Sequence, residues 1–207
     1  MTISTDKTIQ TYDQVAGRYR LRNQDRSPIA AYLARSVELI RARNLEHLPV
    51  LDVGCGPGFD TVSLQNLGLN AVGLDLSWNM LWEGMTHFPA NYAQVDMRSL
   101  PFGSTIGAIW SCASLLHIPR QEAPVVLREF SRVLVRGGLI CLSVKSGEGE
   151  LWTDAPYGDG NKRFFTLWEP DSLDCLLQDS GFRIMESISK SWSGETVWLT
   201  RFAENIG

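Results

Sequence analysis

The sequence lacks several features that would assign it to a special class of protein. None of its apolar runs approaches the ~18 residues that a membrane-spanning helix needs, and residues 1–7 lack the apolar core of a secretory signal. Lysine and arginine number 19 against 23 aspartates and glutamates, so the dense basic surface that binds a phosphate backbone is not expected. We therefore expect a soluble, cytoplasmic protein that binds neither nucleic acid nor membrane.

Metal-ligating residues are sparse. The sequence has no C-x-x-C pair and no paired histidine spacing, so a zinc or other metal site is not supported. We interpret the scattered cysteines as small core or lining residues in a reducing compartment. These residues are Cys55, Cys112, Cys141 and Cys175, with His47, His87 and His117 as the histidines.

The composition is that of an ordinary globular protein. The 207 residues are 44% hydrophobic and 20% charged, which suits one α/β domain with a sizeable core. We expect a single domain over residues 1–207, with an N-terminal helical cap at 1–45 and the core at 46–207.

A glycine turn at residues 54–58 is the most informative stretch. The apolar run 49–53 predicts a buried strand, and residues 59–67 have apolar side chains at helical spacing. Gly54, Gly56 and Gly58 lie between them, so free backbone N–H groups and a helix N-terminus converge on one spot and favour a polar or anionic ligand group. The alternative is a tight turn that only lets helix and strand pack.

Two acidic residues favour binding over packing alone. Asp52 lies within the first apolar run, where a charge is costly unless it is paired. Asp75 ends the next apolar run, about 20 positions after the glycines, where a carboxylate can accept hydrogen bonds from the hydroxyls of a ribose. The pattern therefore predicts a ligand that contains a nucleoside.

At these residues the sequence resembles a known family. The run Leu-Asp-Val-Gly-Cys-Gly-Pro-Gly at 51–58, followed by Gly-Leu-Asp-Leu-Ser at 73–77, is similar to the signature of class I S-adenosylmethionine-dependent methyltransferases. The glycines are spaced G-x-G-x-G, whereas the dinucleotide fingerprint is G-x-G-x-x-G, and position 59 is Phe. The resemblance implies S-adenosylmethionine as cofactor, bound near Gly54, Cys55, Gly56, Gly58, Asp75, Leu76 and Met80.

The order of the remaining apolar runs predicts the fold. Runs at 71–74, 91–95, 105–110 and 139–144 alternate with helical patterns, which predicts parallel strands ending at one edge. Residues 182–188 and 195–202 alternate around a turn and predict a hairpin. With the resemblance, this implies a three-layer Rossmann-like doubly wound sheet of seven strands, mostly parallel, with a C-terminal antiparallel strand. Residues 145–163 have no clear period and predict a long surface loop.

The resemblance assigns further residues to the cofactor. Asp96 and Met97 end the third strand and match the family position that contacts adenine, and Ser111 follows the fourth strand. Tyr12 and Tyr19 share one face of an N-terminal helix, which in the family folds over the cofactor.

The resemblance also implies that an arginine shortly after the second Tyr pairs with the methionyl carboxylate of the cofactor, and a guanidinium suits this role because it can bind a carboxylate through two hydrogen bonds. Arg26 is the preferred residue, with Arg20 and Arg22 as alternates.

The residues that would contact the methyl acceptor have weaker sequence signals than those expected at the cofactor. His117 follows the fourth strand and is a candidate general base, with helix capping or loop packing as the equal alternative. Lys145 follows the fifth strand and is interpreted as a solvated loop charge more readily than as an acceptor contact. Aromatic residues gather between positions 152 and 168, which would suit a planar or cationic acceptor.

Several acceptor classes are excluded by missing motifs. After the fourth strand the sequence reads Ser-Cys-Ala-Ser, without the [DNS]-P-P-[YF] motif of base-nitrogen methyltransferases, a Pro-Cys nucleophile or a glutamate pair. The remaining interpretation is an enzyme that methylates an O or N atom of a small molecule. A dinucleotide oxidoreductase and a non-catalytic cofactor-binding regulator are the alternatives.

Overall fold

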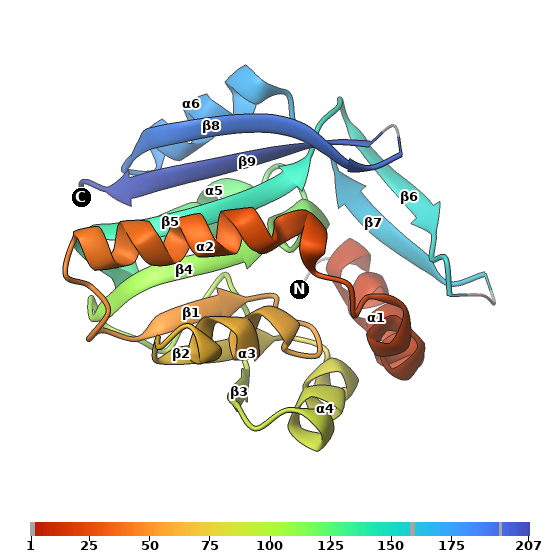
Figure 1. The fold of residues 1–207 in the computed structure, drawn as a ribbon. Coiled ribbons are helices and arrows are strands. Elements are labelled where there is room, and N and C mark those ends of the chain that lie inside the picture. The colour runs from red at the N-terminus through yellow and green to blue at the C-terminus, as the bar shows by residue number, and fades with distance from the viewer. Residues whose placement is uncertain (1–2, 158–159, 195) are drawn as a thin grey trace.

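The computed structural model describes residues 3–157, 160–194 and 196–207, which form a seven-stranded sheet between layers of helices (Figure 1). The strand order is β3-β2-β1-β4-β5-β9-β8. The strands are β1 (Val50–Val53), β2 (Ala71–Asp75), β3 (Asn91–Gln94), β4 (Ile106–Cys112), β5 (Leu134–Lys145), β8 (Phe182–Ser193) and β9 (Thr196–Asn205).

The sheet is parallel from β3 to β5, and β9 runs antiparallel to both of its neighbours, β5 and β8. The chain moves outward from β1 to β3 and then crosses to β4 on the other side of β1, so strand order reverses between β1 and β4. Ligands of open α/β sheets bind outside the carboxyl ends of the strands at such a reversal. The predicted fold class is confirmed.

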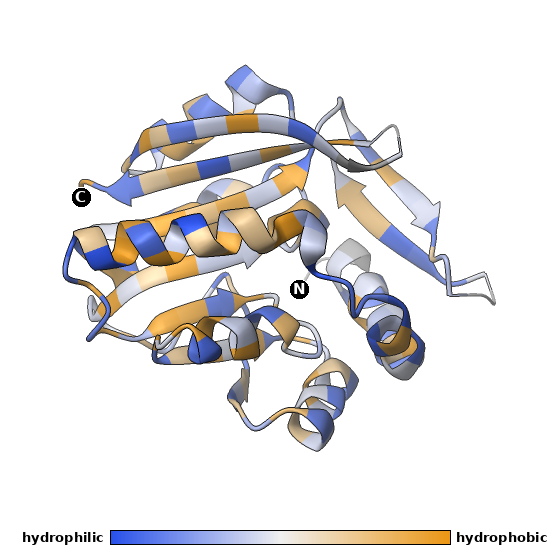
Figure 2. Ribbon diagram, in the orientation of Figure 1, coloured by the Kyte–Doolittle hydropathy of each residue, from blue (hydrophilic) through white to orange (hydrophobic). Residues whose placement is uncertain are grey.

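Helices cover both faces of the sheet, and alternate residues of each strand point to opposite faces. On one face Val50 and Trp110 pack with α2 (Ser27–Ala42) and with Leu64 of α3 (Phe59–Asn66). On the other, Leu51 and Ile109 pack with α5 (Ala123–Val133) and α6 (Pro170–Asp179). Most of β1 is hydrophobic, as expected for a strand buried on both faces (Figure 2).

Helix α1 (Ile3–Arg22) lies apart from these layers, beside α4 (Trp78–His87) and a small two-stranded sheet (Figure 1). Its Asp13 accepts hydrogen bonds from Ser77 Oγ (2.6 Å) and from the backbone N–H of Asn79 (3.0 Å). On the other side, Thr8 Oγ1 accepts from the backbone N–H of Phe164 (3.0 Å). The helix is thus attached to two elements that are far apart in the sequence.

The prediction of a long surface loop over residues 145–163 is wrong. The chain forms a hairpin there, with β6 (Glu150–Asp154) antiparallel to β7 (Lys162–Thr166). The two strands pair mainly with each other, and the inner face of β7 packs against α1. Their sequences therefore lack the regular alternation of apolar and polar residues that marks a strand packed on a large hydrophobic core. The first helix is also longer than the predicted segment around Tyr12 and Tyr19. Within the described residues, no helix has the length and apolarity needed to span a membrane.

Candidate functional site

The turn between β1 and α3 keeps its glycines in the left-handed region of backbone space. Gly54, Gly56 and Gly58 have φ angles of 76°, 54° and 84°. Residues that carry a Cβ adopt such positive φ angles only with steric strain. The backbone N–H of Gly54 donates to the Leu74 carbonyl (2.7 Å), and this bond holds the turn against the end of β2. A Cβ added at Gly56 would meet nothing closer than a Tyr19 ring carbon at 3.8 Å, so the space above this glycine is open.

Asp75 lies at the carboxyl end of β2, beside the turn. Its Oδ2 accepts the backbone N–H of Gly56 (2.8 Å), and its Oδ1 accepts that of Ser77 (2.8 Å). Burial raises the pKa of this carboxyl, and the backbone hydrogen bonds act against that increase. Each carboxylate oxygen can accept a second hydrogen bond, so Asp75 retains acceptor capacity for two hydroxyl groups.

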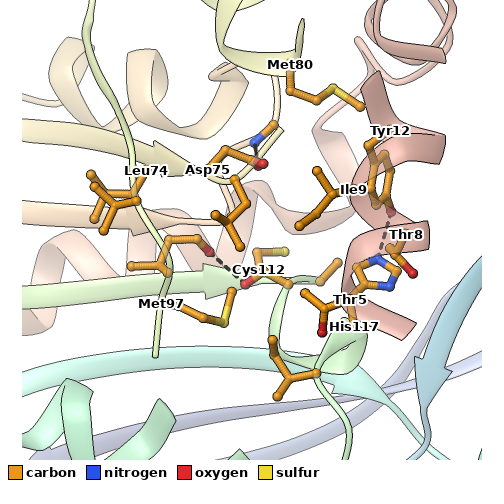
Figure 3. Close-up of a pocket in the computed structure, with 18 of the residues that line it drawn as sticks. Thr5, Thr8, Ile9, Tyr12, Leu74, Asp75, Met80, Met97, Cys112 and His117 are labelled. Carbon is orange, nitrogen blue, oxygen red and sulfur yellow. Dashed lines mark hydrogen bonds between the residues drawn. The ribbon is translucent and has the colours of Figure 1, made fainter. Parts of the chain in front are cut away.

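A hollow of about 760 Å³, including its open mouth, adjoins Asp75 and is here called the donor hollow. Leu74, Leu76, Met80, Val95 and Met97 give it an apolar wall, and α1 covers it from the other side. Figure 3 shows Ile9 and Tyr12 of α1 facing Asp75 and Met80 across this space. An apolar wall with a few convergent polar groups is typical of small-molecule sites.

A second hollow, here called the acceptor hollow, adjoins the first. The two share Tyr12, Tyr19, Gly54, Cys112, Ala113 and His117 as lining residues. The acceptor hollow is further lined by charged, polar and apolar side chains from six parts of the chain: Asn23, Arg26, Asp52, Cys55, Pro57, Phe59, Asp60, Leu116, Lys145, Tyr157, Arg163, Phe165 and Trp198.

Arg26 lines the acceptor hollow and is held by Asp60 of α3. Its Nε and Nη2 donate to the two carboxylate oxygens of Asp60 at 2.8 and 2.6 Å. Asp60 Oδ2 also accepts Trp110 Nε1 (2.9 Å). The Nη1 of Arg26 has no acceptor among the described residues, so one edge of the guanidinium is available to a ligand.

Asp52 is buried and lies near Asp60. Burial, followed by the charge of Asp60, raises the pKa of Asp52 to about 8, although it accepts a hydrogen bond from Thr61 Oγ1 (2.6 Å). Burial and the neighbouring Asp60 thus both disfavour a negative charge on Asp52.

His117 stands where the two hollows meet, at the end of the short helix η1 (Leu115–His117). Its Nδ1 lies 2.6 Å from the Phe164 carbonyl oxygen, which can only accept, so Nδ1 carries the proton. Its Nε2 then accepts the hydroxyl hydrogen of Tyr12 (2.7 Å; Figure 3). Burial, together with the charges of Arg163 and Lys145, lowers the pKa of His117 from 6.5 to about 3, and the hydrogen bond to the Phe164 carbonyl acts against this decrease.

This shift predicts a pH dependence of stability. The unfolded chain takes up a proton at His117 below pH 6.5, whereas the folded chain does so only near pH 3, so the stability it contributes above pH 6.5 is lost as the pH falls. From ~pH 7.5 to ~pH 5, we expect the unfolding free energy of the wild type to fall by about 1–2 kcal/mol more than that of His117→Gln. Urea unfolding measures this difference, with exposed His47→Gln as the control. Parallel curves for wild type and His117→Gln would contradict the assignment.

Most of the site residues expected from the sequence line one of the two hollows. These are Tyr12, Tyr19, Gly54, Gly56, Asp75, Leu76, Met80, Met97 and His117 in the donor hollow, and Arg26 and Cys55 in the acceptor hollow.

Three expected residues do not line either hollow. Gly58 packs against the Tyr92 ring, and a Cβ there would lie 2.2 Å from its hydroxyl. Ser111 is buried and bonds to Ser114 Oγ (2.8 Å). Both carboxylate oxygens of Asp96 accept from Arg98, Oδ1 from Nε (3.0 Å) and Oδ2 from Nη2 (2.7 Å). The adenine contact of Asp96 stays a prediction.

Other lining residues were not expected from the sequence. Thr5, Thr8 and Ile9 line the donor hollow because α1 begins earlier than its aromatic residues indicate. Arg163 lines the acceptor hollow because of the unexpected hairpin. Lys145, interpreted as a solvated charge, also lines this hollow, which corrects that interpretation.

Comparison with known proteins agrees with this geometry. Residues 50–138 match the model of a methyltransferase domain family. This match supports a class I S-adenosylmethionine-dependent methyltransferase. The chain is 33% identical over 141 residues to phosphoethanolamine N-methyltransferase of Triticum aestivum (64% of this chain, 27% of that protein) and 28% identical over 144 residues to malonyl-[acyl-carrier protein] O-methyltransferase of Erwinia billingiae (69% and 52%).

Solved structures show the same fold. The 1,6-didemethyltoxoflavin-N1-methyltransferase of Burkholderia thailandensis, solved with 1,6-didemethyltoxoflavin and S-adenosylhomocysteine, superposes with a TM-score of 0.75 at 16% identity, covering 100% of this chain and 92% of that one. The chain spans about a quarter to a half of the length of the curated relatives above.

S-adenosylmethionine is the cofactor of this family, and the donor hollow fits it. The open space above Gly56, the free acceptor capacity of Asp75 and the apolar wall match a ribose that carries a flat base.

Proposed function

We propose that this protein transfers a methyl group from S-adenosylmethionine to an O or N atom of a small-molecule acceptor. The observation that carries the proposal is the Asp75 carboxylate, fixed by the Gly56 and Ser77 N–H groups at the edge of the donor hollow. A carboxylate held there is suited to the two hydroxyls of a ribose.

The other lining residues have distinct proposed roles. Leu76, Met80 and Met97 would pack on the adenine, while Tyr12 and Tyr19 of α1 cover the hollow and exclude water. The methionyl end would lie over the glycine turn, close to Arg26 in the adjoining hollow. Exclusion of water and alignment of the reactants are the main requirements of this chemistry.

The cofactor supplies an activated methyl group on a sulfonium sulfur, so an acceptor lone pair forms the new bond to carbon while the carbon–sulfur bond breaks and its electron pair stays on sulfur. The acceptor hollow meets the donor hollow at Cys112, Ala113 and His117, and the reacting acceptor atom is placed there in this proposal. His117 is a proposed general base, because the Phe164 carbonyl keeps its Nε2 unprotonated. An acceptor hydroxyl would give its proton to Nε2 either directly, after displacing the Tyr12 hydroxyl, or by way of the Tyr12 hydroxyl as a relay.

Arg26 provides a test of cofactor binding. If its free Nη1 meets the methionyl carboxylate, Arg26→Gln removes a charge-assisted hydrogen bond and weakens S-adenosylhomocysteine binding by about tenfold. The matched control is Arg136→Gln, which makes the same change at an exposed arginine that lines neither hollow. Isothermal titration measures both variants, and equal affinities for wild type and Arg26→Gln would remove Arg26 from the cofactor site.

Turnover is tested by following S-adenosylhomocysteine release from the full chain with a panel of phenols, carboxylic acids and amines. The panel spans both acceptor atoms because the relatives include an N-methyltransferase and an O-methyltransferase by name. Release that depends on one acceptor class supports the proposal, and His117→Ala should slow an oxygen acceptor by about 100-fold or more. Cofactor binding without release on any acceptor would favour a regulatory protein.

A further inference from the structure

Two positive side chains on the wall of the acceptor hollow lack negative partners. Lys145 ends β5 and Arg163 lies on β7, and both line this hollow. No carboxylate in the described part of the chain forms an ion pair with either. A partly buried cation without a counter-charge costs free energy, so an arrangement with two of them indicates a ligand that supplies the charge.

Lys145 is held by rings and not by an acid. Its Nζ lies 4.1 Å from the centre of the Phe165 ring and 5.8 Å from that of Trp198. These contacts stabilise the ammonium only partly, since burial and the charge of Arg163 both lower the pKa of Lys145.

Arg163 has the same kind of surroundings. Its guanidinium carbon lies 5.2, 5.6 and 5.9 Å from the ring centres of Phe165, Tyr157 and Tyr12. Its Nη1 donates only a long hydrogen bond of 3.5 Å to the Tyr12 hydroxyl, and its buried Nε has no partner in the described structure. Buried nitrogens of this kind are almost always bonded, so this one is available to a ligand.

The acids of the same hollow do not offset these two charges. Asp60 is bonded through both oxygens to Arg26, Asp52 accepts a hydrogen bond from Thr61 Oγ1, and neither acid forms an ion pair with Lys145 or Arg163. The wall formed by β5 and β7 therefore has a net positive charge, with aromatic rings beside it.

We propose that the acceptor is an aromatic molecule with an oxyanion group, a carboxylate or a phosphate, and that Lys145 and Arg163 bind this group. The inference rests on the proposed methyl transfer and specifies its substrate class. The rings of Tyr157 and Phe165 offer faces for the flat part of such a molecule. An anion there also offsets the two charges that disfavour protonation of His117, so the proposed base becomes stronger when the acceptor is bound.

The test uses the full chain saturated with S-adenosylhomocysteine and titrated with benzoate, phenyl phosphate and benzamide. The three share one ring and differ in charge. We expect the better of the two anions to bind at least about tenfold more tightly than neutral benzamide. The stronger anion distinguishes a carboxylate site from a phosphate site.

Variants locate the subsite. Lys145→Gln and Arg163→Gln should each remove most of the preference for the anion without changing the affinities for benzamide and S-adenosylhomocysteine, whereas Lys145→Arg should retain it. Lys162→Gln is the matched control, because Lys162 is exposed on the adjacent position of β7.

Equal binding of the three probes, or binding of none at millimolar concentration, would overturn the inference. Loss of S-adenosylhomocysteine affinity in Lys145→Gln or Arg163→Gln would also overturn it, since the two cations would then serve the cofactor. Failure of the wild type to bind S-adenosylhomocysteine would instead count against the proposed function itself.

Discussion

Replacing Asp75 with Asn is expected to weaken binding of S-adenosylhomocysteine by about 100-fold. The amide oxygen accepts a weaker hydrogen bond from a ribose hydroxyl than the carboxylate does, and the amide NH₂ group cannot accept one at all. The amide must also replace a carboxylate that now accepts from two backbone N–H groups, those of Gly56 and Ser77. An NH₂ group that faces either N–H would repel it. Isothermal titration measures the affinity, and circular dichroism checks that the fold is retained.

Asp171→Asn is the matched control, because it makes the same change at an exposed position of α6. Its affinity should equal that of the wild type. An Asp75→Asn variant that binds within about threefold of the wild type would mean that the ribose is not held by Asp75.

Replacing Gly54 with Ala is expected to have the largest effect on stability. The new Cβ would lie 2.2 Å from Ser114 Cβ, and the φ of 76° is strained for any residue with a Cβ. The strain alone costs about 1–2 kcal/mol, and the overlap with Ser114 adds about 1–3 kcal/mol because β1 and β4 are packed around it. Urea unfolding should therefore show a loss of about 2–5 kcal/mol.

Gly56→Ala separates the two causes. Its φ is also positive, but the nearest atom to an added Cβ is 3.8 Å away, so only the conformational strain applies. We expect a loss of about 1 kcal/mol there, together with weaker cofactor binding because the Cβ occupies the open space. In the double variant Gly54→Ala/Ser114→Gly, part of the lost stability should return. Equal losses for Gly54→Ala and Gly56→Ala would contradict the steric account.

The donor side was predictable because its signals are local. The glycine turn and Asp75 lie within a single strand–turn–helix–strand unit, and each residue type has a direct backbone reason. The positions of the parallel strands were predictable for the same reason, since buried parallel strands are continuous apolar runs.

The acceptor side could not be predicted because it is assembled from distant segments. Arg163 reaches Tyr12 across 151 positions, and Phe164 fixes His117 across 47. Strands β6 and β7 pair mainly with each other, so their sequence shows no regular alternation from which to read their register. Arg26 was expected at the cofactor, but its pairing with Asp60 joins two segments that only the packing of α2 and α3 brings together.

The central claim is that the donor hollow binds S-adenosylmethionine, and one titration tests it most directly. The full chain is titrated in a calorimeter with S-adenosylhomocysteine and, separately, with NADH, for wild type and Asp75→Asn. The account predicts one S-adenosylhomocysteine per chain, lost affinity in the variant, and no binding of NADH. Binding of NADH in preference to S-adenosylhomocysteine, or binding of S-adenosylhomocysteine that Asp75→Asn leaves unchanged, would contradict it.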